Sequence, residues 1–154
     1  MSGILVATWL SVQAAASPAV VKVASPAPVT LAPGTSAEVR LSVTVKKGFH
    51  VQASPASEPY LVPVRLEMES LPPLRVAKPI YPRGKPYRLA GAESDLSTYD
   101  GTFEVRLTLE APADAETDEL TLKGRLHYQA CGERICLSPA SVPVSLSVKV
   151  APTR

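Results

Sequence analysis

Three observations predict an all-β fold. Apolar and polar residues alternate with a period of two in several runs, which is typical of half-buried strands. The 16 prolines stand mostly between those runs, where they mark turns. No segment has convincing helical periodicity. Several strands with one wet face each, joined by Pro and Gly turns, favour an antiparallel two-sheet β-sandwich with immunoglobulin-like topology.

The alternation places six strands along the chain. In order they are a short one at Val20–Val23, then Val39–Lys46, Val62–Glu69, Phe103–Glu110, Leu120–Ala130 and Val142–Val150. Val39–Lys46 is typical, because its apolar residues are all valine or leucine and its polar residues fall between them. Pro63 lies inside a predicted strand, and since proline has no backbone donor it indicates a sheet edge or a bulge.

The longest segment without such alternation is Lys78–Gly101. It exceeds the usual length of a connection between packed strands. Loops of this length are often functional lids. The alternative is a solvated insertion that retains some strand.

The amino terminus predicts export. An apolar run, Ile4–Val12, is followed by small residues, Ala14–Ala16, which suit cleavage after Ala16. We therefore expect a signal peptide at residues 1–16 and one domain at Ser17–Arg154, in the periplasm or outside the cell. The absence of Lys and Arg before the apolar run leaves a frayed terminus as the alternative.

Charge and hydropathy exclude several classes of partner. The net charge is +2 with both signs mixed along the chain, which gives little support to nucleic-acid binding or polybasic membrane attachment. No later stretch is apolar enough to span a bilayer. No hydrolytic triad, paired carboxylates or phosphate-binding loop can be assigned, and we expect no cofactor.

The chain has two cysteines, Cys131 and Cys136, with four residues between them. Continuing the alternation from Leu120 puts Cys131 on the face away from the core, unless a bulge near Gly132 reverses it. If Glu133–Arg134 is the tip of a two-residue hairpin, the cysteines oppose each other at a non-hydrogen-bonded position. That geometry accepts a disulfide, at the short end of the usual Cα separation, where strain makes a bond easier to reduce.

Reactivity explains this pair better than stability. A loop so short stabilises a fold by only about 2 kcal/mol on the chain-entropy model. The spacing is not Cys-x-x-Cys, and no helix begins here to lower a thiol pKa, although Arg134 favours a thiolate. We therefore expect a disulfide that is attacked by the low-pKa cysteine of a partner, or a dithiol that a partner oxidises.

Two other readings of the cysteines stay open. One is a purely structural disulfide in a noncatalytic binding or adhesion sandwich. The other is a metal site made of His127, Cys131, Cys136 and His50, although the spacing matches no standard zinc pattern, so our prediction includes no metal.

The run "YQACGERICLSP", Tyr128–Pro139, resembles the active-site hairpin of the N-terminal domain of the thiol:disulfide interchange protein DsbD family. Gly48–Met68, "LPP" from Leu71 and "YPRGK" from Tyr81 are also similar to that family and follow in its order. The resemblance implies an immunoglobulin-like periplasmic domain that exchanges thiols and disulfides with thioredoxin-like proteins, as part of a protein-disulfide reductase. It also implies that Cys136 forms the mixed disulfide with the partner and that Cys131 resolves it.

The family shields its disulfide beneath a cap loop that bears an aromatic residue, and this loop maps into Lys78–Gly101. The candidates for the cap or for shaping the site are Tyr81, Tyr87, Tyr99, Tyr128 and Arg134. Full-length DsbD continues into a membrane electron carrier and a thioredoxin-like domain, whereas this chain stops at Arg154. We therefore expect a monomer whose electron donor is a separate protein, unless the chain is a fragment.

Overall fold

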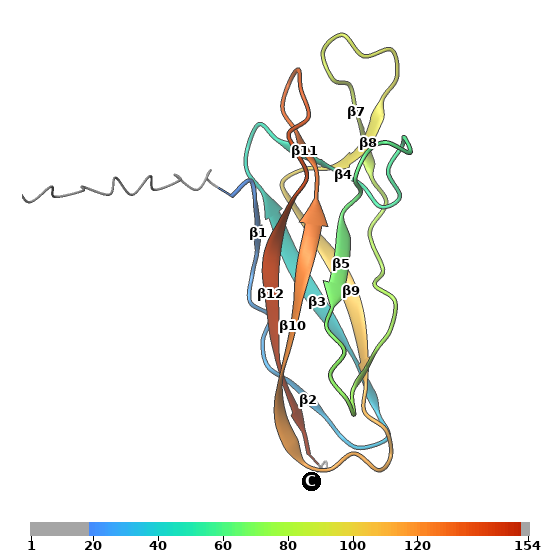
Figure 1. Cartoon of the computed structure of the whole chain (residues 1–154), viewed down its shortest axis with the longest axis vertical. Coiled ribbons are helices and arrows are strands. Elements are labelled where there is room, and N and C mark those ends of the chain that lie inside the picture. Colours follow the sequence, from blue (N-terminus) through green and yellow to red (C-terminus); the bar gives the residue numbers. More distant parts are fainter. Residues whose placement is uncertain (1–18, 152–154) are drawn as a thin grey trace, which may run out of the picture.

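The computed structural model describes residues 19–151, which form twelve β-strands in three four-stranded sheets (Figure 1). The first sheet contains, in order, β1 (Val21–Val23), β3 (Ser36–Val45), β9 (Thr102–Glu110) and β6 (Arg75–Val76). The second contains β2 (Val29–Leu31), β12 (Ala140–Val150), β10 (Asp118–Tyr128) and β5 (Arg65–Met68). The third contains β11 (Ala130–Cys131), β4 (His50–Gln52), β8 (Leu96–Tyr99) and β7 (Lys85–Tyr87). The described residues include no helix, and the predicted all-β, immunoglobulin-like sandwich is confirmed.

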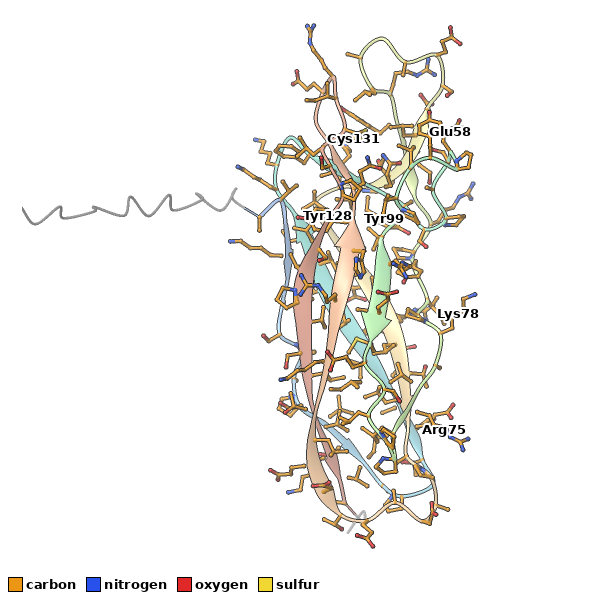
Figure 2. The ribbon with its side chains drawn as sticks, viewed as in Figure 1. Glu58, Arg75, Lys78, Tyr99, Tyr128 and Cys131 are labelled. Atoms are coloured by element: carbon orange, nitrogen blue, oxygen red, sulfur yellow. A yellow bond between two sulfur atoms is a disulfide. The ribbon has the colours of Figure 1, made fainter. Side chains whose placement is uncertain are left out.

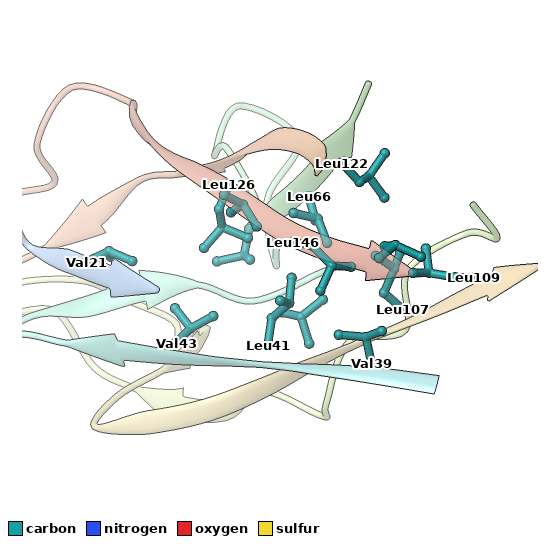
Figure 3. Packing of buried hydrophobic residues seen from close by; sticks show 14 of the residues in the cluster. Val21, Val39, Leu41, Val43, Leu66, Leu107, Leu109, Leu122, Leu126 and Leu146 are labelled. Atoms are coloured by element: carbon teal, nitrogen blue, oxygen red, sulfur yellow. The ribbon is translucent and has the colours of Figure 1, made fainter. Parts of the chain in front are cut away.

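The first two sheets pack against each other around a single hydrophobic core. Long antiparallel ladders form each sheet, β3 with β9 and β10 with β12. Figure 3 shows Leu41 and Leu107 of the first sheet beside Leu146 of the second, and all three side chains are buried. Burying one such side chain is worth roughly 1.5–3 kcal/mol. The inward residues of the alternating strands are therefore what holds the two sheets together.

The four longest strands lie where the alternation predicts them, at β3, β9, β10 and β12. The strand expected at Val62–Glu69 is shorter, because β5 begins only after Pro63. β5 is also an edge strand of its sheet, as that proline predicts. The short strands β2, β6, β7 and β8 carry too few residues to show a period, and the sequence did not reveal them.

The third sheet lies at one end of the sandwich, at the top of Figure 1, and the segment Lys78–Gly101 contributes to it. The expectation of an irregular segment is wrong in part, since β7 and β8 lie within it and pair with each other. Gly84 precedes β7 at a close approach, because a Cβ there would stand 2.6 Å from the Cβ of Ala53 and against the hydroxyl of Ser97. Glycine at this point lets β7 lie against the rest of the sheet.

Within residues 19–151, no helix is long and apolar enough to cross a membrane. The signal peptide expected at residues 1–16 lies outside the described residues.

Candidate functional site

Cys131 and Cys136 form a disulfide in a tight hairpin at the end of the molecule. They pair across an isolated antiparallel bridge, with Cα atoms 3.8 Å apart. Two backbone hydrogen bonds frame the pair, from the amide of Gly132 to the carbonyl of Ile135 (2.9 Å) and from the amide of Leu137 to the carbonyl of Ala130 (2.7 Å). This pattern is that of a non-hydrogen-bonded pair in an antiparallel ladder. The predicted hairpin, with Glu133 and Arg134 at its tip, is therefore confirmed.

The two sulfur-bearing residues differ in exposure. Cys131 is 0% exposed, whereas Cys136 is partly exposed. Ala130 and its partner Val51 belong to the core cluster and Cys131 does not, so Cys131 lies on the predicted side of the strand, but the expected exposure of that side is wrong. Tyr128 and Ala130 are buried as the alternation predicts, but Cys131 is buried directly after Ala130.

The chain changes sheets between these residues, and this change brings Cys131 beside β4. β10 ends at Tyr128, where it pairs with β12, and β11 then begins at Ala130 and pairs with β4 of the third sheet. The side chain of Gln129 bridges the step, because it accepts a hydrogen bond from the amide of Val62 (2.9 Å) and donates one to the carbonyl of Leu137 (3.2 Å). The alternation of burial continues through Gln129 and ends at Cys131, which is buried next to the buried Ala130.

A glutamine contacts the buried sulfur. The side-chain amide of Gln52 donates a hydrogen bond from Nε2 to Sγ of Cys131 at 3.1 Å, and Gln52 is itself 0% exposed. It lies on β4, the strand between β11 and β8. Sequence reasoning did not single out Gln52, because the three residues of β4 are too few for a face to be assigned.

Tyr87 connects the segment Lys78–Gly101 to the hairpin. Its hydroxyl donates to the carbonyl of Gly132 at 3.0 Å, and its ring stacks on that of His50 with centroids 3.6 Å apart. Farther along, the amide of Ala90 donates to the carbonyl of Glu133 at 2.9 Å. Figure 1 shows the loop between β7 and β8 rising beside the hairpin. We call this loop, residues 88–95, the flanking loop.

Two ion pairs lie at the two ends of the β7–β8 ladder, one of them within the flanking loop. Nε of Arg88 lies 2.5 Å from a carboxylate oxygen of Asp95, and Nζ of Lys85 lies 3.0 Å from one of Asp100. The hydrogen bond from Lys85 lowers the pKa of Asp100 below its ordinary value. These side chains are exposed, so the pairs contribute little to stability, and only the Arg88–Asp95 pair joins the two ends of the loop.

The other tyrosines support the fold below the hairpin. The Tyr99 hydroxyl accepts from the amide of Ser54 (3.1 Å) and donates to the carbonyl of Pro82 (2.8 Å). The Tyr81 hydroxyl accepts from the amide of Leu66 at 2.8 Å. Burial raises the pKa of both phenols above the ordinary value, and these backbone hydrogen bonds partly oppose the shift.

Figure 2 shows Cys131 nearer the end of the molecule than Tyr99 and Tyr128. Tyr128 is buried in the core, and Arg134 is exposed at the hairpin tip. Of the five residues expected to cap or shape the site, the structure therefore brings Tyr87 and Arg134 to the hairpin surface and uses Tyr81, Tyr99 and Tyr128 beneath it.

The residues considered for a metal site are engaged elsewhere. Both cysteines are in the disulfide, and the ring of His50 stacks on Tyr87. Nε2 of His127 lies 2.8 Å from a carboxylate oxygen of Glu67 on the neighbouring strand. Between residues 19 and 151, no three His, Cys, Asp or Glu side chains gather as a metal site would require.

Comparison with solved structures supports the fold. The N-terminal periplasmic domain of ScsB from Proteus mirabilis superposes with a TM-score of 0.51 at 15% identity, over 82% of this chain and 44% of that one. The chain thus spans less than half of the length of that structure. Two further matches have TM-scores of 0.37, too low to carry an argument. They are a PapD-like domain of human CEP192 (13% identity, 96% of this chain and all of that one) and a family 123 glycoside hydrolase from Clostridium perfringens (9% identity, 88% and 28%).

No curated protein matches the chain. The sequence model described as "Thiol:disulfide interchange protein DsbD, N-terminal" matches residues 17–147, which is most of the chain and includes both cysteines. The chain therefore belongs to the family of the N-terminal domain of the thiol:disulfide interchange protein DsbD.

Proposed function

We propose that this domain relays reducing equivalents in the periplasm, by thiol–disulfide exchange between its Cys131–Cys136 pair and thioredoxin-like proteins. Membership of the DsbD family supports thiol–disulfide interchange as the general chemistry. In this role the domain is one component of a protein-disulfide reductase. The partners and the roles of the two cysteines are part of the proposal.

The unequal burial of the two cysteines carries the proposal. An attacking thiolate must approach the sulfur it bonds to along the S–S axis, and Cys136 is partly exposed while Cys131 is 0% exposed. The partner's thiolate bonds to Sγ of Cys136, the Cys131–Cys136 bond breaks, and its electron pair leaves on Sγ of Cys131. A second thiol of the partner then attacks the mixed disulfide and releases Cys136, so that the partner is oxidised and this domain is reduced by two electrons.

The surface beside Cys136 suits a protein partner. Ile135 is 66% exposed and Leu137 is 37% exposed, so large apolar side chains flank the accessible cysteine on both sides. A protein whose cysteine reaches Sγ of Cys136 must cover these residues, and their burial would contribute to binding. Exposed apolar groups at the point of contact support a protein substrate over a small thiol.

The position of the flanking loop supports its assignment as the cap that shields the disulfide in this family. It meets the hairpin through the Tyr87 hydroxyl and the amide of Ala90, on backbone carbonyls of Gly132 and Glu133. Each such hydrogen bond is worth only about 0.5–1.5 kcal/mol. The loop can therefore be displaced by a partner that offers comparable contacts.

Location and domain limits complete the proposal. A signal peptide at residues 1–16 would direct the domain, residues 17–154, to the periplasm, where a disulfide persists. The family match begins at residue 17, directly after the expected cleavage site, which supports this boundary.

The test is a redox titration with a matched pair of trapping variants. Oxidised protein is equilibrated with glutathione buffers and read by thiol alkylation, and Cys131→Ser and Cys136→Ser variants are each incubated with an oxidised thioredoxin. We expect a potential within the range of thioredoxins and disulfide isomerases, roughly −270 to −180 mV. For trapping, the thioredoxin keeps only its attacking cysteine, activated as a mixed disulfide with thionitrobenzoate, so that the departing thionitrobenzoate cannot reverse the step; we expect an adduct with the Cys131→Ser variant alone. A potential well below about −300 mV with no adduct from either variant would show a structural bridge instead.

A further inference from the structure

Gln52 places an uncharged amide where an apolar residue would be expected. The side chain is 0% exposed, and the residues before and after it in the chain, Val51 and Ala53, belong to the core. Burying an amide costs free energy unless its groups are hydrogen-bonded. Here Nε2 donates to Sγ of Cys131 at 3.1 Å, and Oε1 has no hydrogen-bond partner among the described residues. The amide is therefore only half satisfied, which calls for a reason other than packing.

The backbone of Gln52 is held on both sides. Its backbone amide donates to the backbone carbonyl of Gln129 at 3.1 Å, and its backbone carbonyl accepts from the backbone amide of Val64 at 3.0 Å. Gln52 also pairs with Thr98 on β8. Since β4 is fixed on both sides, the side-chain amide remains directed at the sulfur when the disulfide opens.

We propose that Gln52 is a positioning residue that makes Cys131 the leaving sulfur, and so directs a partner's thiolate to Cys136. This inference rests on the proposed function. When the Cys131–Cys136 bond breaks, the electron pair arrives on Sγ of Cys131, which is buried and would otherwise hold its charge without solvent. The Nε2 hydrogen bond becomes charge-assisted at that moment and is then roughly twice as strong as a neutral one. Attack on the opposite sulfur would place the charge on Cys136, which this amide does not contact.

The same amide also serves the reverse step. In the reduced protein, a protonated Cys131 can donate its S–H to Oε1, which the disulfide leaves without a partner. A thiolate on Cys131 accepts from Nε2 instead. Gln52 thus offers a partner to both protonation states of the resolving cysteine.

Two substitutions test this role, and both keep the size of the side chain. Gln52→Met removes the donor, and Gln52→Glu replaces it with a carboxylate that repels a thiolate. Thr98→Val is the matched control, because Thr98 is a buried polar residue on the neighbouring strand, 1% exposed. The other titratable or charged side chains on the third sheet, the hairpin, the flanking loop and the residue after β8 remain unchanged in all three, namely His50, Lys85, Tyr87, Arg88, Glu93, Asp95, Tyr99, Asp100, Glu133 and Arg134.

The first readout is the pH profile of Cys131 alkylation by iodoacetamide, measured in a Cys136→Ser background. Loss of a hydrogen bond to a charged group shifts the thiol–thiolate balance by about ten- to a hundred-fold. We expect Gln52→Met to shift the profile of Cys131 to higher pH by that factor, Gln52→Glu to shift it further, and Thr98→Val to leave it unchanged. In the protein with both cysteines, reduction by glutathione slows by a smaller factor, about three- to ten-fold, since only part of the charge has developed at the transition state.

A measurement on the unsubstituted protein guards against variants that fail to fold. In ¹⁵N-labelled reduced protein, the side-chain amide resonances of Gln52 should titrate together with the Cys131 thiol. An unchanged alkylation profile in Gln52→Met, or amide resonances that do not respond as Cys131 ionises, would overturn the role of Gln52. Failure of the proposed function would give a different result, because the unsubstituted protein would then resist reduction and form no mixed disulfide.

Discussion

Reduction of the Cys131–Cys136 disulfide should weaken the fold only slightly. The cysteines are separated by 5 positions, and the chain-entropy model gives about 2 kcal/mol for closing so short a loop. The body of the sandwich does not depend on that loop, because most of its core residues lie on β3, β9, β10 and β12. A single domain has about 5–15 kcal/mol of stability, so the reduced protein should remain folded.

Urea unfolding followed by circular dichroism measures this difference. Oxidised and reduced protein are compared at one pH, with Leu146→Ala as an internal scale, since truncating a buried leucine costs about 2–5 kcal/mol. We expect reduction to lower the free energy of unfolding by about 2 kcal/mol, with an unchanged denaturant slope. A loss above about 4 kcal/mol, or reduced protein that is unfolded in buffer, would show that the bond is a structural staple and that the argument from loop length is wrong.

Three further predictions concern the surface and the buried phenols. Replacing Ile135 and Leu137 together by serine should slow exchange with a thioredoxin but leave exchange with dithiothreitol unchanged, because only a protein partner covers these side chains. Tyr87→Ala should speed reduction by dithiothreitol severalfold, since it removes both the hydrogen bond to Gly132 and the ring stack that hold the flanking loop. The contribution of Tyr81 and Tyr99 to stability should be constant below pH 10.0 and be lost above it, because their raised pKa values let the unfolded chain lose its protons first.

Each of these has a control and a contrary result. Ile80→Ser is the control for the double variant, because Ile80 is 50% exposed and its backbone forms a bridge to Arg106 on β9. If Ile80→Ser slows exchange equally, the case for a docking surface at Ile135 and Leu137 is lost. Tyr60→Ala, at a side chain 76% exposed, is the comparison for Tyr87, and an equal gain in rate from both would contradict the role of the flanking loop. Stability that is constant to pH 12 would contradict the burial of the two phenols.

The sandwich could be predicted because each of its long strands has one solvent-exposed face and one buried face. In β3 and β10 this contrast repeats over many residues, which is enough to fix both the strand and its orientation. The hairpin could be predicted for a local reason, since only two residues, Glu133 and Arg134, lie between the paired residues Gly132 and Ile135, and a two-residue connection permits few turn geometries.

Contacts between distant parts of the chain could not be predicted. The chain leaves the second sheet after Tyr128 and pairs as β11 with β4, which brings Cys131 beside Gln52, and no local pattern indicates a change of partner strand. Gln52 was missed for the same reason, because its contact with Cys131 joins positions 79 residues apart. The family resemblance limited the candidates for the capping residue to a few tyrosines, including Tyr87. The pairing of β7 with β8, which the sequence did not reveal, is what brings Tyr87 to the hairpin.

The unequal burial of the two cysteines has a consequence for how the protein matures. The disulfide closes a local loop and can form in a newly made chain before any sheet exists, when both sulfurs are equally open to attack. The contacts around Cys131 form only when β4 joins β11. The difference in exposure between the two sulfurs is therefore acquired during folding, and the ratio in which a small thiol labels them would report on how far folding has gone.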